Sequence, residues 1–382
     1  MPTCERPAKA AWFTDTIDDL NGVARTVRAM SAAAARQGYA LTVATCRPAA
    51  PVAAPPPANR RNFRPVWQFA LPKYPSLTVT VPPFRALYRF LRRGGFDTVI
   101  ISTPGPVGLA ALAAAKLLGL RTVGIDHTDF PRYVHFLTGS AGLARLTAGA
   151  MRLVYGRFDT LLVNSEYYRR RWLARGFAAA RLHLLPRGLD TDLFNPQRRD
   201  GAFWQRRGAD RRVLLYVGRV SKEKELGFLA EIYRELRRQA APVDLAVVGD
   251  GPYLAELRAL IPTAIFTGAL GGDELGAAYA SADLFLFPST TDTFGNVVIE
   301  AIASGLPVLV ADVGGPQELA DGRACRVLPA GNLAAWVNAV RDWLRQPPDR
   351  ATLAARAAQI RRERNWDAAA EQFWTLTARR AA

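Results

Sequence analysis

The stretch "ADLFLFPSTTDTFGNVVIEAIASGLPVLVAD", residues 282–312, decides the fold. It opens with a short apolar run, "ADLFLFPS", which is typical of a strand buried on both faces. A polar loop, "TTDTFGN", comes next, followed by an apolar helical segment, "NVVIEAIASG", which Gly305 and Pro307 end. A second apolar run, "LPVLVAD", completes the unit. Strand, helix and strand in this order predict a parallel sheet of the α/β class.

The same alternation extends in both directions along the chain. In the first half, short apolar runs predict strands at 8–14, 40–46, 97–103, 121–127 and 160–165. Helical patterns lie between these strands, including Gly22–Gln37 and Gly108–Leu118. A second series of strands begins with "RRVLLYVGR" (211–219) and ends with "ACRVLP" (324–329). We therefore predict two Rossmann-like domains whose parallel sheets face a cleft.

A chain of 382 residues is long for a single hydrophobic core, which also favours two domains. The polar and basic segment 195–212 is predicted to hold the linker, so that residues 1–195 form one domain and residues 196–360 the other. An amphipathic pattern over 365–380 predicts a C-terminal helix, and residues 361–382 are expected to pack back on the first domain. The Pro-rich segment 47–63 is expected to be a surface excursion.

The net charge of +17 is unevenly distributed. Residues 1–195 contain 26 Lys and Arg against 11 Asp and Glu, or +15, whereas residues 196–382 contain 24 against 22, or +2. This asymmetry indicates a polyanionic partner, either nucleic acid or an anionic membrane surface. The alternative is an Arg-rich composition with solvated faces, which by itself should affect both halves. No nucleic-acid-binding motif is present, so the membrane surface is the favoured partner.

Three scattered cysteines, Cys4, Cys46 and Cys325, offer neither a disulfide framework nor the spacing of a zinc site. Their number and placement favour a reducing compartment. The first residues lack the apolar segment of a secretory signal. The longest apolar stretch, 98–120, is interrupted by two prolines and a lysine, and it is predicted to be a strand, a turn and a packed helix rather than a membrane span. These features predict a cytoplasmic protein.

Cations follow the first strand of the second half, at the edge of the sheet where open α/β folds bind ligands. Arg219 and Lys224 lie five residues apart in "YVGRVSKEKEL" (216–226). They suit a diphosphate, because arginine can bridge two oxygens and lysine supplies a compact charge. In the first half, Gly22 opens a helix whose amides an anion could approach. A solvated charge run and a simple helix-start glycine are the structural alternatives.

The opening stretch also carries two carboxylates, eight residues apart. Asp292 lies in the loop at the carboxyl end of its strand, and Gly295 and Asn296 open the next helix with amides that lack helical acceptors. Glu300 is the one charge on an apolar helix, where a carboxylate is costly unless a polar group holds it. A ribose diol would hold it, and protein donors are the alternative. These groups and the cation pair fall on one sheet edge, which favours a ligand site over separate structural roles.

Taken together, the motifs resemble those of a known family. "GRVSKEKEL", "VVGDGP", "STTDTFGNVVIEAIASGLPV" and "VGGPQEL" look like the retaining glycosyltransferases of family 4, which have the GT-B fold. In the first half, "HTDFPRY", "VNSEYY" and "LLPRGLDTDLFNP" look like the branch with GDP-mannose-dependent α-mannosyltransferases and sulfoquinovosyl-diacylglycerol-synthase-like enzymes. The resemblance covers nearly the whole chain. It implies transfer of a hexose, with mannose favoured, from GDP-mannose or a UDP-sugar, with no metal cofactor.

The family's E-x7-E motif falls on Asp292 and Glu300. The resemblance implies that Glu300 binds the nucleotide ribose and that position 292 binds hydroxyls of the donor sugar. It further implies donor contacts from the following residues: Gly22, Arg219, Lys224, Phe294, Gly295 and Asn296. Here the chain departs from the family, because position 292 is Asp rather than Glu. One methylene fewer shortens the reach by roughly 1.5 Å, which bears on donor choice.

His127, in "GIDHTDFPRY", matches a histidine that lies beside the transferred sugar in relatives and is implicated in catalysis. The resemblance therefore makes it a catalytic residue together with Arg219, Lys224 and Asp292, and Asp129 is expected on the acceptor side. The alternative is a hydrogen-bonded core histidine. "LDTDLF" (189–194) contains a D-x-D sequence, but the nearby prolines indicate turn and cap residues, and no metal site is predicted.

Three stretches of the first half mix arginine with aromatic or aliphatic residues, at 82–96, 143–158 and 166–177. On helices they would place cations beside apolar groups, as interfacial segments do. With the charge asymmetry they predict peripheral contact with the inner face of a membrane and a lipid or lipid-linked glycan acceptor. A solvated rim around an ordinary core is the alternative. Two rival functions remain: a nucleotide-sugar 2-epimerase of the same fold, and a non-enzymatic protein that binds polyanions or membranes.

Overall fold

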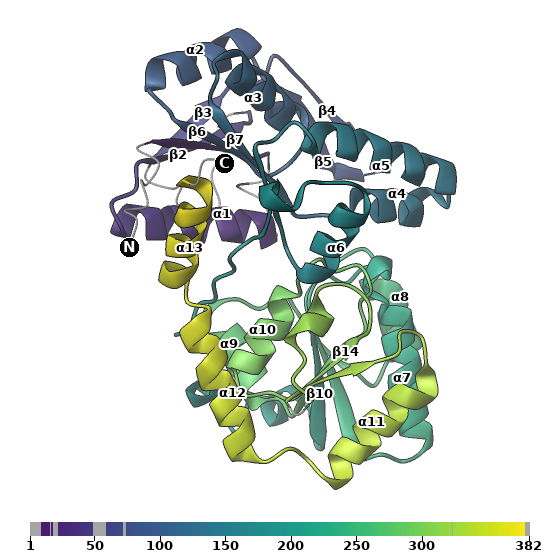
Figure 1. Cartoon of the computed structure of the whole chain (residues 1–382). Coiled ribbons are helices and arrows are strands. Elements are labelled where there is room, and N and C mark those ends of the chain that lie inside the picture. The colour runs from purple at the N-terminus through teal and green to yellow at the C-terminus, as the bar shows by residue number, and fades with distance from the viewer. Residues whose placement is uncertain are drawn as a thin grey trace. The chain divides into compact units, whose positions relative to one another are not determined.

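The computed structural model describes residues 9–15, 17, 22–48, 59–71, 74–322 and 324–378. The chain forms two compact units, which are described separately below (Figure 1). The first unit is Met1–Gly188 together with Trp366–Ala382, and the second is Leu189–Asn365. The predicted α/β class is confirmed, because each unit is built on a parallel sheet covered by helices.

A seven-stranded sheet forms the centre of the first unit, in the order β3-β2-β1-β6-β7-β8-β9. All neighbouring strands are parallel, and Trp12 of β1 pairs with Val43 of β2 on one side and Ile100 of β6 on the other. The strands are β1 Ala10–Phe13, β2 Leu41–Cys46, β3 Arg60–Phe63, β6 Thr98–Ile101, β7 Arg121–Asp126, β8 Thr160–Val163 and β9 Leu182–Leu184. The strand order reverses at β1 and β6, where open α/β sheets bind ligands beyond the carboxyl ends.

Helices cover both faces of this sheet because its strands are apolar on both faces. On one face, α1 (Gly22–Arg36) contacts the C-terminal helix α13 (Trp366–Ala378). There Trp12 stacks on Phe373, with ring centroids 5.0 Å apart, and Tyr39 stacks on Trp374 at 4.8 Å. The other helices of the unit are α2 Phe84–Gly94, α3 Pro106–Leu117, α4 Phe130–Thr138, α5 Ala141–Tyr155 and α6 Glu166–Ala174. The last helix of the chain thus returns to the first unit.

The second unit has a six-stranded parallel sheet in the order β12-β11-β10-β13-β14-β15. Its strands are β10 Arg212–Val217, β11 Val243–Val248, β12 Ile265–Gly268, β13 Leu284–Phe287, β14 Val308–Ala311 and β15 Cys325–Leu328. Its helices are α7 Leu226–Arg238, α8 Leu254–Leu260, α9 Gly272–Ser281, α10 Asn296–Ala303, α11 Leu333–Arg345 and α12 Arg350–Glu363. Here the strand order reverses between β10 and β13, so the loops after these two strands lie side by side.

The prediction of a linker at 195–212 is wrong. Phe203 and Trp204 lie within this segment and are buried in the core of the second unit, and the Trp204 indole donates to the carbonyl of Ala278 at 3.2 Å. The chain passes between the units at Gly188–Leu189 instead, and returns at Asn365–Trp366. The polar and basic composition of the segment concealed two aromatic residues that anchor it.

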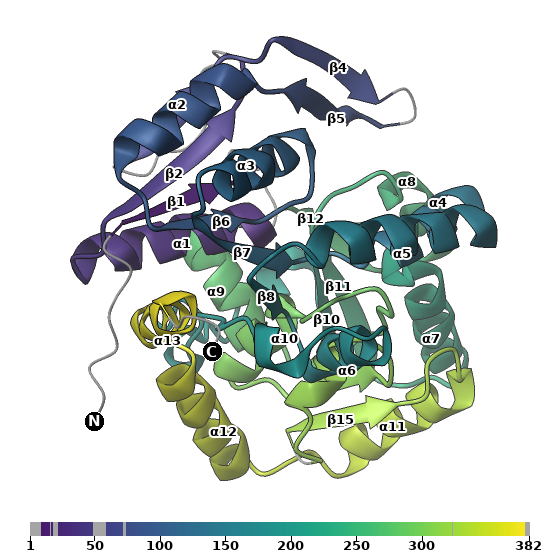
Figure 2. The same cartoon turned by 45° about the horizontal axis from the view of Figure 1, so that its top comes forward.

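The Pro-rich excursion predicted at 47–63 is only partly described, because residues 49–58 lie outside the described part of the chain. Its end is a strand rather than an excursion: β3 pairs with β2 in parallel, and Phe63 is buried. An antiparallel hairpin of β4 (Trp67–Leu71) and β5 (Tyr74–Val81) follows, which the sequence analysis did not predict. Figure 2 shows this hairpin projecting beside α2.

Within the described ranges, no helix is both long enough and apolar enough to cross a bilayer.

Candidate functional site

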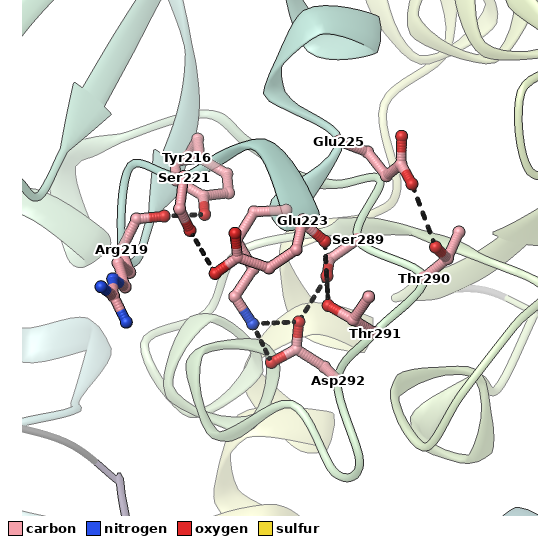
Figure 3. Close-up of polar contacts among 10 residues, drawn as sticks. Tyr216, Arg219, Ser221, Glu223, Glu225, Ser289, Thr290, Thr291 and Asp292 are labelled. Atoms are coloured by element: carbon pink, nitrogen blue, oxygen red, sulfur yellow. Dashed lines mark hydrogen bonds and ion pairs between the residues drawn. The ribbon is translucent and has the colours of Figure 1, made fainter. Parts of the chain in front are cut away.

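The predicted cations and the first predicted carboxylate lie on two loops at the point where the strand order of the second sheet reverses. One loop follows β10 and leads through a 3-10 turn at Lys222–Lys224 into α7, and the other follows β13 and leads into α10. Because the sheet is parallel, both loops leave from the same edge. Figure 3 shows the side chains of the two loops turned toward each other.

Lys224 and Asp292 form an ion pair between these loops. The ammonium donates to both carboxylate oxygens, at 3.0 and 2.9 Å. Each side chain is only about one-fifth exposed, at 20% and 21%. The hydroxyl of Ser289, a buried residue, donates to Asp292 at 2.5 Å. The structure therefore brings together two of the predicted site residues and adds Ser289, which no sequence pattern indicated.

Further hydrogen bonds tie the two loops together. The Thr290 hydroxyl donates to the Glu225 carboxylate at 3.2 Å, and the Thr291 hydroxyl donates to the carbonyl of Glu223 at 2.9 Å. Glu225 has a left-handed backbone, with φ of 57°, which is uncommon for a residue other than glycine. This conformation ends the turn that carries Lys224 and starts α7. Strain of this kind concentrates at functional sites, where the surroundings hold it in place.

Arg219 does not join this cluster. Its carbonyl accepts a hydrogen bond from the hydroxyl of Tyr216 at 3.1 Å, while its side chain is exposed. Figure 3 shows the guanidinium extending away from Asp292. Arg219 lies on the predicted sheet edge, but the structure does not place it in contact with Lys224 or Asp292.

The backbone at the start of α10 is closely packed against a glycine-rich loop. Gly295 has φ of 88°, and a Cβ there would lie 2.8 Å from the ring of Pro316. The amide of Gly315 donates to the carbonyl of Asp292 at 3.1 Å, and a side chain at Gly314 would lie 2.6 Å from that oxygen. The backbone that follows Asp292, including Phe294 and Asn296, is therefore held in one conformation at the amino end of the helix, where amides attract anions.

Glu300 is buried in α10, with 4% of its surface exposed. The hydroxyl of Tyr279, on α9, donates to its carboxylate at 3.0 Å. The ring of Tyr279 is itself fixed between Phe194 and Phe285. A protein donor thus holds one oxygen of Glu300, as the structural alternative requires, and orients the carboxylate. Tyr279 was not predicted, because nothing distinguishes it from other core aromatic residues.

The first unit holds a second group of predicted residues around His127, at the carboxyl end of β7. The buried guanidinium of Arg187 lies 3.4 Å from His127 Nδ1, donates to Asn164, and donates to the Thr26 hydroxyl at 3.0 Å. Thr26 donates in turn to the carbonyl of Gly22 at 2.8 Å. Gly22 and His127 therefore belong to one network. Arg187 and Asn164 lie in motifs quoted above, but the motifs assigned them no role.

The surroundings of His127 determine its protonation. Burial, and then the charge of Arg187, lower the pKa of His127 well below its usual range, so the imidazole is neutral at physiological pH. Arginine can only donate, so Nδ1 must be the acceptor and the ring proton is on Nε2. His127 can therefore offer an N–H donor to a ligand oxygen, and it is not set up as a general base.

Asp129 caps α4, because its carboxylate accepts from the amide of Arg132 at 3.3 Å, and it also pairs with Arg171 at 2.5 Å. Its neighbour Asp126 is fully buried and accepts from the indole of Trp172 at 2.6 Å. Both aspartates line a small cavity of about 10 Å³, which is room for one water molecule. Asp129 is held by protein groups, and its predicted place on the acceptor side remains a prediction.

Asp126 makes the stability of the first unit depend on pH. Burial raises the pKa of this carboxyl from 3.8 to about 6, so the folded protein binds its proton more tightly than the unfolded chain does. Its contribution is favourable below about pH 4 and is lost as the pH rises through 6. We expect Asp126→Asn, which cannot ionise, to stabilise the protein by about 2–3 kcal/mol at pH 8 relative to its effect at pH 4.

Thermal unfolding of the wild type and the variant at both pH values checks this expectation. A difference in Tm that does not change with pH would show that Asp126 does not carry the dependence.

The D-x-D sequence forms a turn, as the flanking prolines indicated. Asp190 accepts from the amides of Asp192 and Leu193, at 3.2 and 3.0 Å. In the described part of the chain, no group of three His, Cys, Asp or Glu side chains is arranged to hold a metal ion.

Comparison with known proteins identifies the family to which these two units belong. Residues 211–346 match the family model "Glycosyl transferases group 1", and residues 20–193 match "Glycosyltransferase Family 4". A GDP-mannose-dependent alpha-mannosyltransferase from Mycobacterium tuberculosis is 34% identical over 79% of this chain and 78% of its own length. The chain is a family 4 glycosyltransferase. The family predicted from the motifs is thereby confirmed.

Other members of this glycosyltransferase family agree in sequence and fold. A sulfoquinovosyl transferase from Arabidopsis thaliana is 31% identical over 79% of this chain and 60% of its own. Sucrose-phosphate synthase from Thermosynechococcus elongatus superimposes with a TM-score of 0.72 at 21% identity, over 96% and 98% of the two chains. Anabaena HepE in complex with UDP-glucose gives a TM-score of 0.73 at 18% identity, over the same shares. The fold is GT-B, as predicted.

Proposed function

We propose that this glycosyltransferase transfers mannose from GDP-mannose, with retention of the α configuration and without a metal ion, to a lipid or lipid-linked glycan at a membrane surface. The observation that carries the donor assignment is the 34% identity to a GDP-mannose-dependent alpha-mannosyltransferase over most of both chains. The second unit supplies the residues that a nucleotide sugar needs: the Lys224–Asp292 pair, the start of α10, and the buried Glu300.

The proposed chemistry is departure of the diphosphate and attack of the acceptor on the same face of the sugar. Double displacement would need a carboxylate placed as nucleophile about 5 Å from a carboxylic acid, and the motifs supply no such pair. Lys224, Arg219 and the amides at the start of α10 would stabilise the charge on the departing diphosphate. The departing phosphate would accept the acceptor proton. The neutral His127, with its proton on Nε2, would donate to a sugar oxygen rather than remove a proton.

Charge and exposed apolar residues of the first unit support a membrane-bound acceptor. Residues 20–96 contain no Asp or Glu at all. Exposed apolar residues lie around the β4–β5 hairpin and on α5, and they include Val66, Trp67, Leu146 and Leu153, which are 72%, 63%, 71% and 62% exposed. A relative from Mycolicibacterium smegmatis that is 31% identical over 68% of this chain is named as a phosphatidylinositol monomannoside mannosyltransferase. Such a lipid presents its sugar at an anionic surface.

A transfer assay tests the proposal. The full chain is incubated with GDP-mannose, UDP-glucose, UDP-glucuronate or UDP-sulfoquinovose, each with membrane lipid extract and with excess chelator. We expect mannosyl transfer to lipid from GDP-mannose, an α linkage in the product by NMR, and undiminished activity with chelator. Conversion of the nucleotide sugar without any acceptor would favour the epimerase, and binding to vesicles without nucleotide-sugar binding would favour the non-enzymatic rival.

Replacing the exposed arginines Arg89, Arg92 and Arg93 of α2 by Gln should weaken binding of the full chain to anionic vesicles while donor affinity is unchanged. Each arginine near an anionic surface contributes about 1 kcal/mol at low salt. The attraction is screened over roughly 8 Å at physiological ionic strength, so salt should also release the wild type.

The control replaces three exposed arginines of the second unit, Arg234, Arg341 and Arg362, by Gln, which removes the same charge. Flotation with vesicles of phosphatidylglycerol and of phosphatidylcholine measures both variants. Equal loss in both, or equal binding of the wild type to the two vesicle types, would contradict a membrane surface on α2.

A further inference from the structure

Two groups that the proposed function assigns to different parts of the donor are bonded to each other. Lys224 is assigned to the diphosphate and Asp292 to the donor-sugar hydroxyls, yet the lysine ammonium contacts both oxygens of the carboxylate, at 3.0 and 2.9 Å. A diphosphate that takes Lys224 must therefore compete with Asp292 for it. The effect of that competition is inferred below, and the inference rests on the proposed function.

This ion pair is built into the fold rather than formed by two loose surface chains. Both side chains are about four-fifths buried, and Ser289 holds the carboxylate from a second side. Thr290 and Thr291 fix the loop of Asp292 to the turn of Lys224, through Glu225 and the carbonyl of Glu223. Because the loops are held at this separation, neither charge can withdraw without breaking several contacts. Asp292 thus stays within reach of the site where the diphosphate is expected.

The presence or absence of the sugar changes the partners available to Asp292. A carboxylate is only an acceptor, and it needs donors in a partly buried site. When a nucleotide sugar binds, sugar hydroxyls can donate to Asp292 in place of the lysine, which is then free for the phosphate oxygens. When a bare nucleoside diphosphate binds, no hydroxyl replaces the lysine, and an unpaired carboxylate faces the phosphates.

We infer that the Lys224–Asp292 pair makes the site reject the bare nucleoside diphosphate, so that the sugar is required for full use of Lys224. The pair is a specificity device that acts through repulsion as well as attraction. It discriminates against the leaving group of the reaction itself and therefore assists release of the product nucleotide. Asp292 would accordingly limit affinity for GDP while supporting affinity for GDP-mannose.

Calorimetry with GDP, GDP-mannose and guanosine tests this inference on the full chain. We expect Asp292→Asn to bind GDP roughly three- to tenfold more tightly than the wild type, because Lys224 is released from a partly buried ion pair. Guanosine affinity should not change, since guanosine has no phosphate. The preference for GDP-mannose over GDP should fall at least tenfold. Asp292→Ser also removes the charge, and should behave alike if the amide variant fails to fold.

The matched control is Asp273→Asn, which removes one negative charge from an exposed carboxylate of the same unit. It should leave all three affinities unchanged. If the wild type binds GDP-mannose but both variants at 292 bind GDP no more tightly than the wild type, the inference is overturned and the proposed function stands. If the wild type binds none of the nucleotide sugars, the proposed function fails, and the inference with it.

Discussion

Lys224→Met is expected to lower kcat by roughly 10²- to 10³-fold, as removal of one preorganised donor to a developing charge does in other enzymes. The lysine lies on a turn fixed by the left-handed Glu225 and faces the start of α10, where an anion would lie. Negative charge on the diphosphate grows as the bond to the sugar breaks. A contact that strengthens in the transition state lowers the barrier more than it aids ground-state binding. Guanosine affinity should therefore change little.

Arg219→Met should act in the same direction, because this exposed guanidinium can reach phosphate oxygens. Lys222→Met is the matched control, since Lys222 belongs to the same turn but is exposed and pairs with Glu256 at 2.9 Å. It should leave kcat near that of the wild type. Steady-state kinetics with each variant, together with guanosine titration, separates turnover from nucleoside binding. Near-normal turnover in both Lys224→Met and Arg219→Met would place the diphosphate elsewhere.

The parts of the fold that depend on strand and helix periodicity could be predicted from the sequence. "ADLFLFPS" and "LPVLVAD" contain the buried strands β13 and β14, and the apolar segment between them contains α10. Since the carboxyl ends of parallel strands share one edge, the amino-acid sequence alone could place Lys224 and Asp292 near each other. That they would bond to each other could not be predicted, because their contact depends on the tilt of two loops.

Other errors arose where local composition and tertiary packing disagree. Segment 195–212 is polar enough to suggest a linker, yet Phe203 and Trp204 anchor it in the core of the second unit. The β4–β5 hairpin leaves Trp67 and Phe69 exposed, so it lacks the buried face from which strands are usually predicted. In both cases a few aromatic side chains, placed by distant parts of the chain, decide the structure.

The residues that support the site were missed for a similar reason. Tyr279 lies 21 residues before Glu300 on a different helix, and Arg187 lies 60 residues after His127. Neither has a sequence pattern that distinguishes it from core or surface residues of the same type. Their roles come from tertiary contacts, which hold a carboxylate in one unit and a neutral imidazole in the other.

Glu300→Gln is expected to weaken binding of GDP-mannose and of GDP by roughly ten- to 150-fold, which corresponds to about 1.5–3 kcal/mol for hydrogen bonds to a charged group. The carboxylate is buried on an apolar helix, where a charge is costly unless it is well bonded. Tyr279 supplies one donor, and a ribose diol would supply further charge-assisted bonds. The amide keeps the shape of the side chain and can still accept from Tyr279, so the variant should remain folded.

The ribose assignment has a sharper test in the ligand than in the protein. The wild type should prefer GDP to its 2′,3′-dideoxy analogue, because the analogue lacks the hydroxyls that would donate to Glu300, and this preference should disappear in Glu300→Gln. Tyr279→Phe should weaken GDP binding less while keeping the preference, since the carboxylate is then less well oriented but still charged. Glu256→Gln, at an exposed glutamate of the same unit, controls for net charge. Calorimetry that finds equal preference for the ribose hydroxyls in the wild type and in a folded Glu300→Gln variant would show that Glu300 is held for structural reasons alone.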